Sequence, residues 1–184
     1  MLNAILSFGL IILLFVSPTY AARDNNSYDG NIYFLYGANG SLVPPSSTLA
    51  KSLERSRTSV IIYYLDDSAT SKSFAPKVSA LQLLWKNAID LIPVSTDEFQ
   101  GIIQNDIKKE GFYWHGNIPQ IVVIDGNGKV QLDKEGQVSL EEINAAISNA
   151  TGLDAPKYSV SIKSFNEYNS EPMKEGYDTP RSMK

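Results

Sequence analysis

Residues 68–76 of this chain read Ser-Ala-Thr-Ser-Lys-Ser-Phe-Ala-Pro, and residues 118–120 read Ile-Pro-Gln. The first stretch follows an apolar run at residues 60–65, and the second precedes another at residues 121–124. Such short apolar runs are typical of strands buried on both faces of a sheet. After position 68, large apolar side chains recur at helical spacing, at Phe74, Val78, Leu81 and Trp85. Both stretches therefore mark strand ends in a predicted α/β fold.

The rest of the middle of the chain alternates between strand and helix patterns. We expect strands at residues 31–36, 58–65, 89–94, 120–124 and 129–132, the last two joined by the turn Asp-Gly-Asn-Gly. Helix patterns begin near residues 46, 68, 97 and 139, the last with a capping box formed by Ser139 and Glu142. This alternation predicts a mixed sheet with a parallel core, an antiparallel edge and flanking helices.

Residues 68–76 resemble the active-site turn of the thioredoxin family, Cys-x-x-Cys-Lys-x-x-Ala-Pro, with serine at both cysteine positions. Residues 118–120 resemble the family's Ile-Pro-Thr segment, whose proline follows a cis peptide bond. The resemblance implies a thioredoxin-like fold over residues 31–152 and a cis bond before Pro119. It also implies that Ser68, Ser71 and Pro119 are vestigial positions of an active site.

The absence of cysteine excludes the chemistry of that family. Disulfide exchange needs a thiolate to attack and a second sulfur to resolve the mixed disulfide, and the chain contains no cysteine. Two further family positions also differ: the buried aspartate is replaced by Ile62, and the tryptophan before the first cysteine by Asp67. We therefore expect a redox-inactive domain with no catalytic residue.

Two enzyme alternatives use the serines instead. Ser68 could form a hydrolase triad with His115, the single histidine, and Asp66 or Asp67, but the glycines of a nucleophile elbow do not frame this serine. Alternatively, Ser68 and Ser71 at the helix start could hold an external thiol such as glutathione. No residues that would bind the carboxylates of glutathione are identifiable.

The turn and the loop before Pro119 are also the predicted surface for a protein partner. In this fold the two segments face each other, and a helix start without its chemistry leaves backbone N–H donors for a ligand. The candidate contact residues are Asp67, Ala69, Thr70, Trp114, His115 and Ile118. For Trp114, packing over the edge of the sheet is an equally weighted alternative.

The two ends of the chain differ from the middle. Residues 1–22 contain no charged side chain and have an apolar core at residues 10–16, which predicts a signal peptide and export. Because no Lys or Arg precedes this core, an uncleaved anchor is the alternative. Residues 23–30 are expected to be a polar linker. Residues 153–184 are expected to be a flexible tail or, alternatively, a docking segment that orders on a partner.

Charge and motifs exclude several classes of ligand. The net charge is −4 and no basic stripe is present, so we expect no nucleic-acid partner. Zinc and haem motifs are absent from the sequence, and Asp125, Asn127 and Asp133 fit turn positions better than calcium ligands. We predict neither a cofactor nor a metal.

Five longer stretches are similar to a small cyanobacterial group of exported thioredoxin-like proteins: residues 36–45, 63–76, 79–85, 90–98 and 113–130. That group is described as thylakoid membrane photosystem I accessory factors. The resemblance implies a binding or assembly module in the thylakoid lumen, at the thylakoid membrane or in the periplasm. It also implies a protein partner in a membrane complex, with peripheral or anchored membrane association. A purely structural periplasmic domain is the third possibility.

Overall fold

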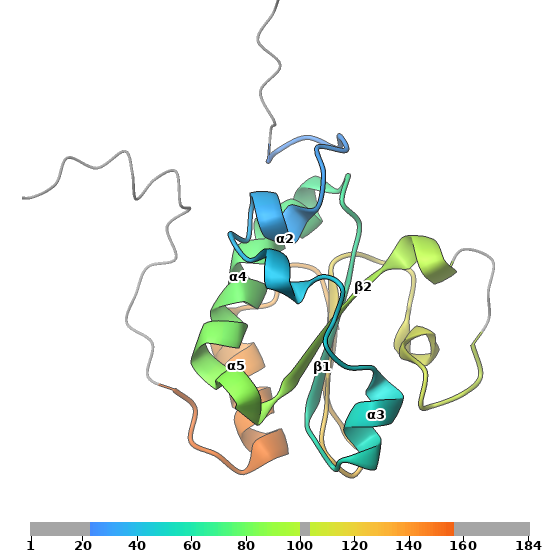
Figure 1. The fold of residues 1–184 in the computed structure, drawn as a ribbon, viewed down its shortest axis with the longest axis vertical. Coiled ribbons are helices and arrows are strands. Elements are labelled where there is room, and N and C mark those ends of the chain that lie inside the picture. The colour runs from blue at the N-terminus through green and yellow to red at the C-terminus, as the bar shows by residue number, and fades with distance from the viewer. Residues whose placement is uncertain (1–22, 100–103, 157–184) are drawn as a thin grey trace, which may run out of the picture.

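The computed structural model describes residues 23–99 and 104–156 of the 184-residue chain (Figure 1). The predicted signal peptide, residues 1–22, lies outside the described residues. The predicted tail lies outside them from residue 157 onward.

A four-stranded mixed sheet forms the centre of the domain. Its strands are β1 (Ser59–Tyr64), β2 (Asp90–Ser95), β3 (Gln120–Ile124) and β4 (Val130–Glu135). Their order is β2-β1-β3-β4, with β1 parallel to β2 and antiparallel to β3, and β3 antiparallel to β4. Pro93, which cannot donate a hydrogen bond to a neighbouring strand, lies on the edge strand β2.

Four α-helices accompany the sheet: α2 (Ile32–Leu35), α3 (Leu49–Glu54), α4 (Ala69–Trp85) and α5 (Leu140–Thr151). Short 3-10 helices are η1 (Gly40–Leu42), η2 (Lys86–Ala88), η3 (Thr96–Phe99) and η4 (Glu110–Tyr113). Figure 1 shows α4 and α5 on one face of the sheet and α3 on the other. The predicted α/β architecture, a mixed sheet with flanking helices, is confirmed.

The sheet separates two hydrophobic cores because successive side chains of a strand point to opposite faces. Val60, Ile62 and Tyr64 of β1 pack in the core under α4 and α5. Ile61 and Tyr63 of the same strand pack in the second core, against α3 and η4. Every residue of β1 and β3 is buried, as the continuous apolar runs predicted.

Two predicted elements are corrected. Residues 31–36 form the helix α2 and not a strand, because the Asn31 side chain accepts hydrogen bonds from the N–H groups of Tyr33 and Phe34 and so caps a helix. Of the helix expected from Asp97, the described residues show only η3, and residues 100–103 lie outside them. The described residues 104–109 are not helical, so that prediction fails there.

No helix in residues 23–99 or 104–156 is both long enough and apolar enough to cross a bilayer.

Candidate functional site

Ser68 caps the start of α4. Its Oγ accepts a hydrogen bond from the Ser71 N–H at 3.3 Å, and it lies 2.9 Å from Thr70 Oγ1. A serine at this position satisfies one of the helix N–H groups that otherwise have no partner in the helix. The hydroxyl at the first vestigial position therefore stabilises the helix and is only partly exposed.

Ser71 occupies the second vestigial position and is buried. Its Oγ accepts a hydrogen bond from the Leu65 N–H at 3.3 Å, just past the end of β1. This contact ties the strand to the helix that follows it. Ser71 faces the interior and Ser68 caps the helix. The two hydroxyls are therefore not arranged to bind one external thiol, such as that of glutathione, together.

The start of α4 meets two other segments. Thr70 Oγ1 donates a long hydrogen bond, 3.5 Å, to the carbonyl of Ile118, and the Ile118–Pro119 peptide bond is cis. From the other side, Gln137 Nε2 donates to the carbonyl of Thr70 at 2.7 Å, and the Gly136 N–H donates to the carbonyl of Pro119 at 2.7 Å. The structure thus brings the predicted turn and the predicted proline loop together.

His115 takes part in a polar network beside this loop. Its side chain is 52% exposed, and Nε2 lies 2.7 Å from Asp133 Oδ2 on β4. The buried Gln120 donates to Asp133 Oδ1 at 2.8 Å and to the Tyr113 carbonyl at 2.7 Å, and accepts from the His115 N–H at 3.1 Å. The network fixes the loop to the start of β3.

The network gives His115 a different carboxylate partner from the two that the triad hypothesis named. That partner is Asp133, whereas Asp66 accepts from the Ile32 N–H at 2.9 Å and so anchors α2. Burial raises the pKa of the Asp66 carboxyl, and the neighbouring carboxylates Asp97 and Asp67 raise it further. The site is therefore not arranged as a serine hydrolase.

Trp114 belongs in part to the second core. Its ring centroid lies 5.2 Å from that of Tyr63 at a tilt of 38°, and the side chain is half-buried. The ring thus packs on Tyr63 of the interior strand β1, whereas the packing alternative named the edge of the sheet. The exposed candidate residues at the site are Asp67, Thr70 and His115, with Ala69 and Ile118 half-buried between them.

Lys72 is the residue at this site that sequence reasoning missed. Its side chain is completely buried, and Nζ donates to the carbonyls of Asn25 and Ser27 at 3.2 and 2.6 Å and to Asp29 Oδ2 at 2.6 Å. The hydrogen bond from Lys72 to Asp29, together with one from Tyr36, lowers the pKa of the Asp29 carboxyl. Lys72 lies in the helix between the buried positions 71 and 74, so the helical pattern places it near the interior. Since a buried charge normally has a partner, this placement was the signal that could have identified Lys72.

Residues 23–29, expected to be a linker, lie against the start of α4. Asn26 Oδ1 accepts from the Ala69 N–H at 3.0 Å, and Arg23 Nη2 donates to the Ser73 carbonyl at 3.3 Å. Together with the contacts to Lys72, these bonds hold the segment, which we call the N-terminal strap, next to the candidate site. Within the described residues no cluster of three or more metal-binding side chains is present.

Comparison with known proteins adds one clear relative. No family model matches the chain. Over 153 residues the chain is 36% identical to Thylakoid membrane protein slr1796 of Synechocystis sp., an alignment that covers 82% of this chain and 76% of that protein. Similar solved structures include a mutant thioredoxin from Halobacterium salinarum, with 16% identity, a TM-score of 0.46, and coverage of 58% of this chain and 85% of that one. Another, titled as a malarial protein, has 16% identity, a TM-score of 0.42, and coverage of 51% and 97%.

Proposed function

Because the chain belongs to the family of the cyanobacterial thylakoid membrane protein slr1796, we propose that it is a redox-inactive binding or assembly module at a photosynthetic membrane. The partner is a protein of a thylakoid membrane complex, and photosystem I is the complex we favour. The domain is exported to the lumenal side, where it associates with the membrane peripherally or through its N-terminal segment.

One observation carries this proposal: the site keeps the parts that would bind a partner and lacks the parts that would react with one. The start of α4 remains joined to the proline loop through Thr70 and Ile118. The two serines bond backbone N–H groups, and the chain has no cysteine. Such a surface can recognise a protein segment through exposed Asp67, Thr70 and His115 without chemical turnover.

The test is recovery of the partner from membranes with the site blocked. A tagged full-length chain would be purified from mildly solubilised thylakoid membranes, and the co-purifying complexes identified by mass spectrometry. Thr70→Arg adds a bulky charge at an exposed helix position of the site. Asn149→Arg is the matched control, because Asn149 is exposed on α5 and lies away from the site. The next residue, Ala150, accepts a hydrogen bond from Thr58, which precedes β1, whereas the turn follows the other end of β1.

We expect photosystem I subunits with the wild-type chain and with Asn149→Arg, and a clear loss with Thr70→Arg. Equal recovery with both variants would contradict the site. Recovery of no photosynthetic complex with the wild-type chain would contradict the function.

A further inference from the structure

The N-terminal strap and α2 carry a second surface, formed by Tyr28, Phe34 and Leu35, which we call the N-terminal patch. We propose that this patch rests in the headgroup region of the lipid bilayer. The inference depends on the membrane location proposed above and on residues 1–22 remaining attached as an anchor, the alternative to a cleaved signal peptide. It goes beyond that proposal by naming the part of the domain that touches lipid.

Along the sequence, the patch is the densest group of exposed large apolar residues in the described part of the chain. Tyr28, Phe34 and Leu35 are 74, 69 and 44% exposed. They make up three of the eight exposed large hydrophobic residues described, and they fall within eight positions of sequence. Single exposed apolar side chains are ordinary, but a group of them is typical of an interaction surface.

The domain holds the patch in a fixed position. Lys72 binds Ser27 and Asp29 on either side of Tyr28, and Asn31 caps α2 just before Phe34. The short α2 packs on α4. The three exposed side chains therefore lie on a segment that hydrogen bonds and helix packing hold to the rest of the domain.

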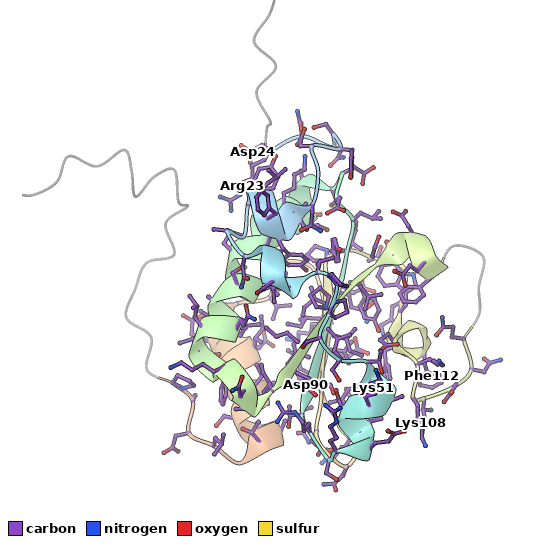
Figure 2. All side chains as sticks on the ribbon, viewed as in Figure 1. Arg23, Asp24, Lys51, Asp90, Lys108 and Phe112 are labelled. Atoms are coloured by element: carbon purple, nitrogen blue, oxygen red, sulfur yellow. The ribbon has the colours of Figure 1, made fainter. Side chains whose placement is uncertain are left out.

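The neighbouring sequence identifies lipid as the occupant. Residues 1–22 carry no charged side chain, and only five residues lie between Ala22 and Tyr28. An extended chain covers at most about 3.6 Å per residue, so Tyr28 must lie within roughly 22 Å of the end of that segment. Arg23, which is labelled in Figure 2, is bonded to the Ser73 carbonyl on α4, and α4 packs against α2, which shortens the reach further.

The chemistry of the patch also fits a bilayer better than a protein. Aromatic side chains such as Tyr are enriched where a membrane meets water, and Phe and Leu favour the acyl boundary just below. Three side chains are too few for a stable protein interface, which buries about 800 Å² on each partner. They suffice as a second contact for a domain whose preceding segment supplies the first.

The experiment uses the absence of cysteine, because a single introduced cysteine is then the only labelling site. The full chain would carry Phe34→Cys or Leu35→Cys, labelled with an environment-sensitive fluorophore. Leu83→Cys and Ile107→Cys are matched controls, since Leu83 and Ile107 are 70 and 59% exposed on other parts of the domain. Each chain would bind vesicles of phosphatidylcholine and phosphatidylglycerol, with and without a nitroxide-labelled lipid.

We expect the nitroxide lipid to quench the probes at positions 34 and 35 and to leave those at 83 and 107 unchanged. Phe34→Ser should also weaken partition into unlabelled vesicles about tenfold, which is the lower end for removing a Phe side chain from an apolar environment, and Leu83→Ser should not.

Two results would overturn the lipid contact of the patch and leave the proposed function intact. One is equal quenching at all four positions, and the other is no quenching at any position while the chain stays bound to vesicles. A concentration-dependent spectral change at position 34 without vesicles would assign the patch to a second copy and overturn the lipid contact. Loss of photosystem I recovery, with quenching as expected, would affect only the proposed function.

Discussion

Lys72 is the residue whose removal tests the structure most directly. Its ammonium group is completely buried and donates to two backbone carbonyls of the N-terminal strap and to Asp29. The variant Lys72→Met keeps the aliphatic stem and removes the charge and the donors. A hydrogen bond from a charged group to a buried carbonyl contributes about 1.5–3 kcal/mol.

The carbonyl of Ser27 receives the shorter bond, 2.6 Å, and that of Asn25 the longer, 3.2 Å. Because the strap lies at the surface, water can replace part of this loss. We therefore expect the free energy of unfolding to fall by about 3 kcal/mol, near the lower limit for breaking a buried ion pair. With a urea m-value of about 2 kcal/mol/M, the midpoint should fall by about 1.5 M.

The assay is urea unfolding followed by far-UV circular dichroism and tryptophan fluorescence. Lys134→Met is the control, because Lys134 pairs with Glu142 at the surface, where an ion pair contributes about 0–1 kcal/mol. Asp29→Asn should destabilise less than Lys72→Met, and the double variant should show positive coupling between the two. A midpoint for Lys72→Met within about 0.3 M of wild type would refute the buried contact, since it corresponds to well under 1 kcal/mol.

Three further predictions concern the candidate site. Trp114→Ala should lower the free energy of unfolding by about 2 kcal/mol in the same urea assay, less than for a fully buried ring, because Trp114 is half-buried against Tyr63; an unchanged midpoint would move this ring out of the core. The raised pKa of Asp66 means that the folded state binds a proton more tightly than the unfolded state. Stability should therefore decline as pH rises above about 4, and Asp66→Asn, which keeps an acceptor for Ile32, should abolish that decline; a persisting decline would assign it to another group. The double variant Ser68→Cys with Ser71→Cys should form an intramolecular disulfide under oxidant, as thiol titration would show, because the two positions match those of the cysteine pair in the thioredoxin turn; free thiols would contradict that alignment of the turn.

The sequence predicted those elements whose own residues determine them. The apolar runs at residues 60–65 and 121–124 became most of β1 and β3, and Ser139 accepts from the Glu142 N–H at the start of α5 as its capping box indicated. The segment that became α2 was mispredicted because its aromatic and β-branched residues favour a strand. In the structure, Asn31 caps it and Asp66, 34 positions away, accepts from its first N–H. Tertiary contacts there override local propensity.

In the candidate site, too, some features could be predicted from the sequence and others depend on tertiary contacts. The closeness of the turn to Pro119 followed from the thioredoxin resemblance, and the Thr70–Ile118 contact agrees with it. The pairing of His115 with Asp133 could not be predicted, because it depends on where β4 places its side chains relative to the loop. The contact between Lys72 and Asp29 spans 43 positions, and no spacing rule in the sequence connects them.

Pro93 lies on β2, one outer strand of the sheet, and this position limits how other chains can join the sheet. A proline leaves the strand one backbone donor short, and prolines on edge strands hinder pairing with a further strand. At the opposite edge, β4 exposes Asp133, Lys134 and Glu135, and such a charged border discourages strand pairing. Copies of the domain crowded in one compartment are thereby protected from edge-to-edge aggregation, and a ligand of this protein must be recognised by its side chains and loops.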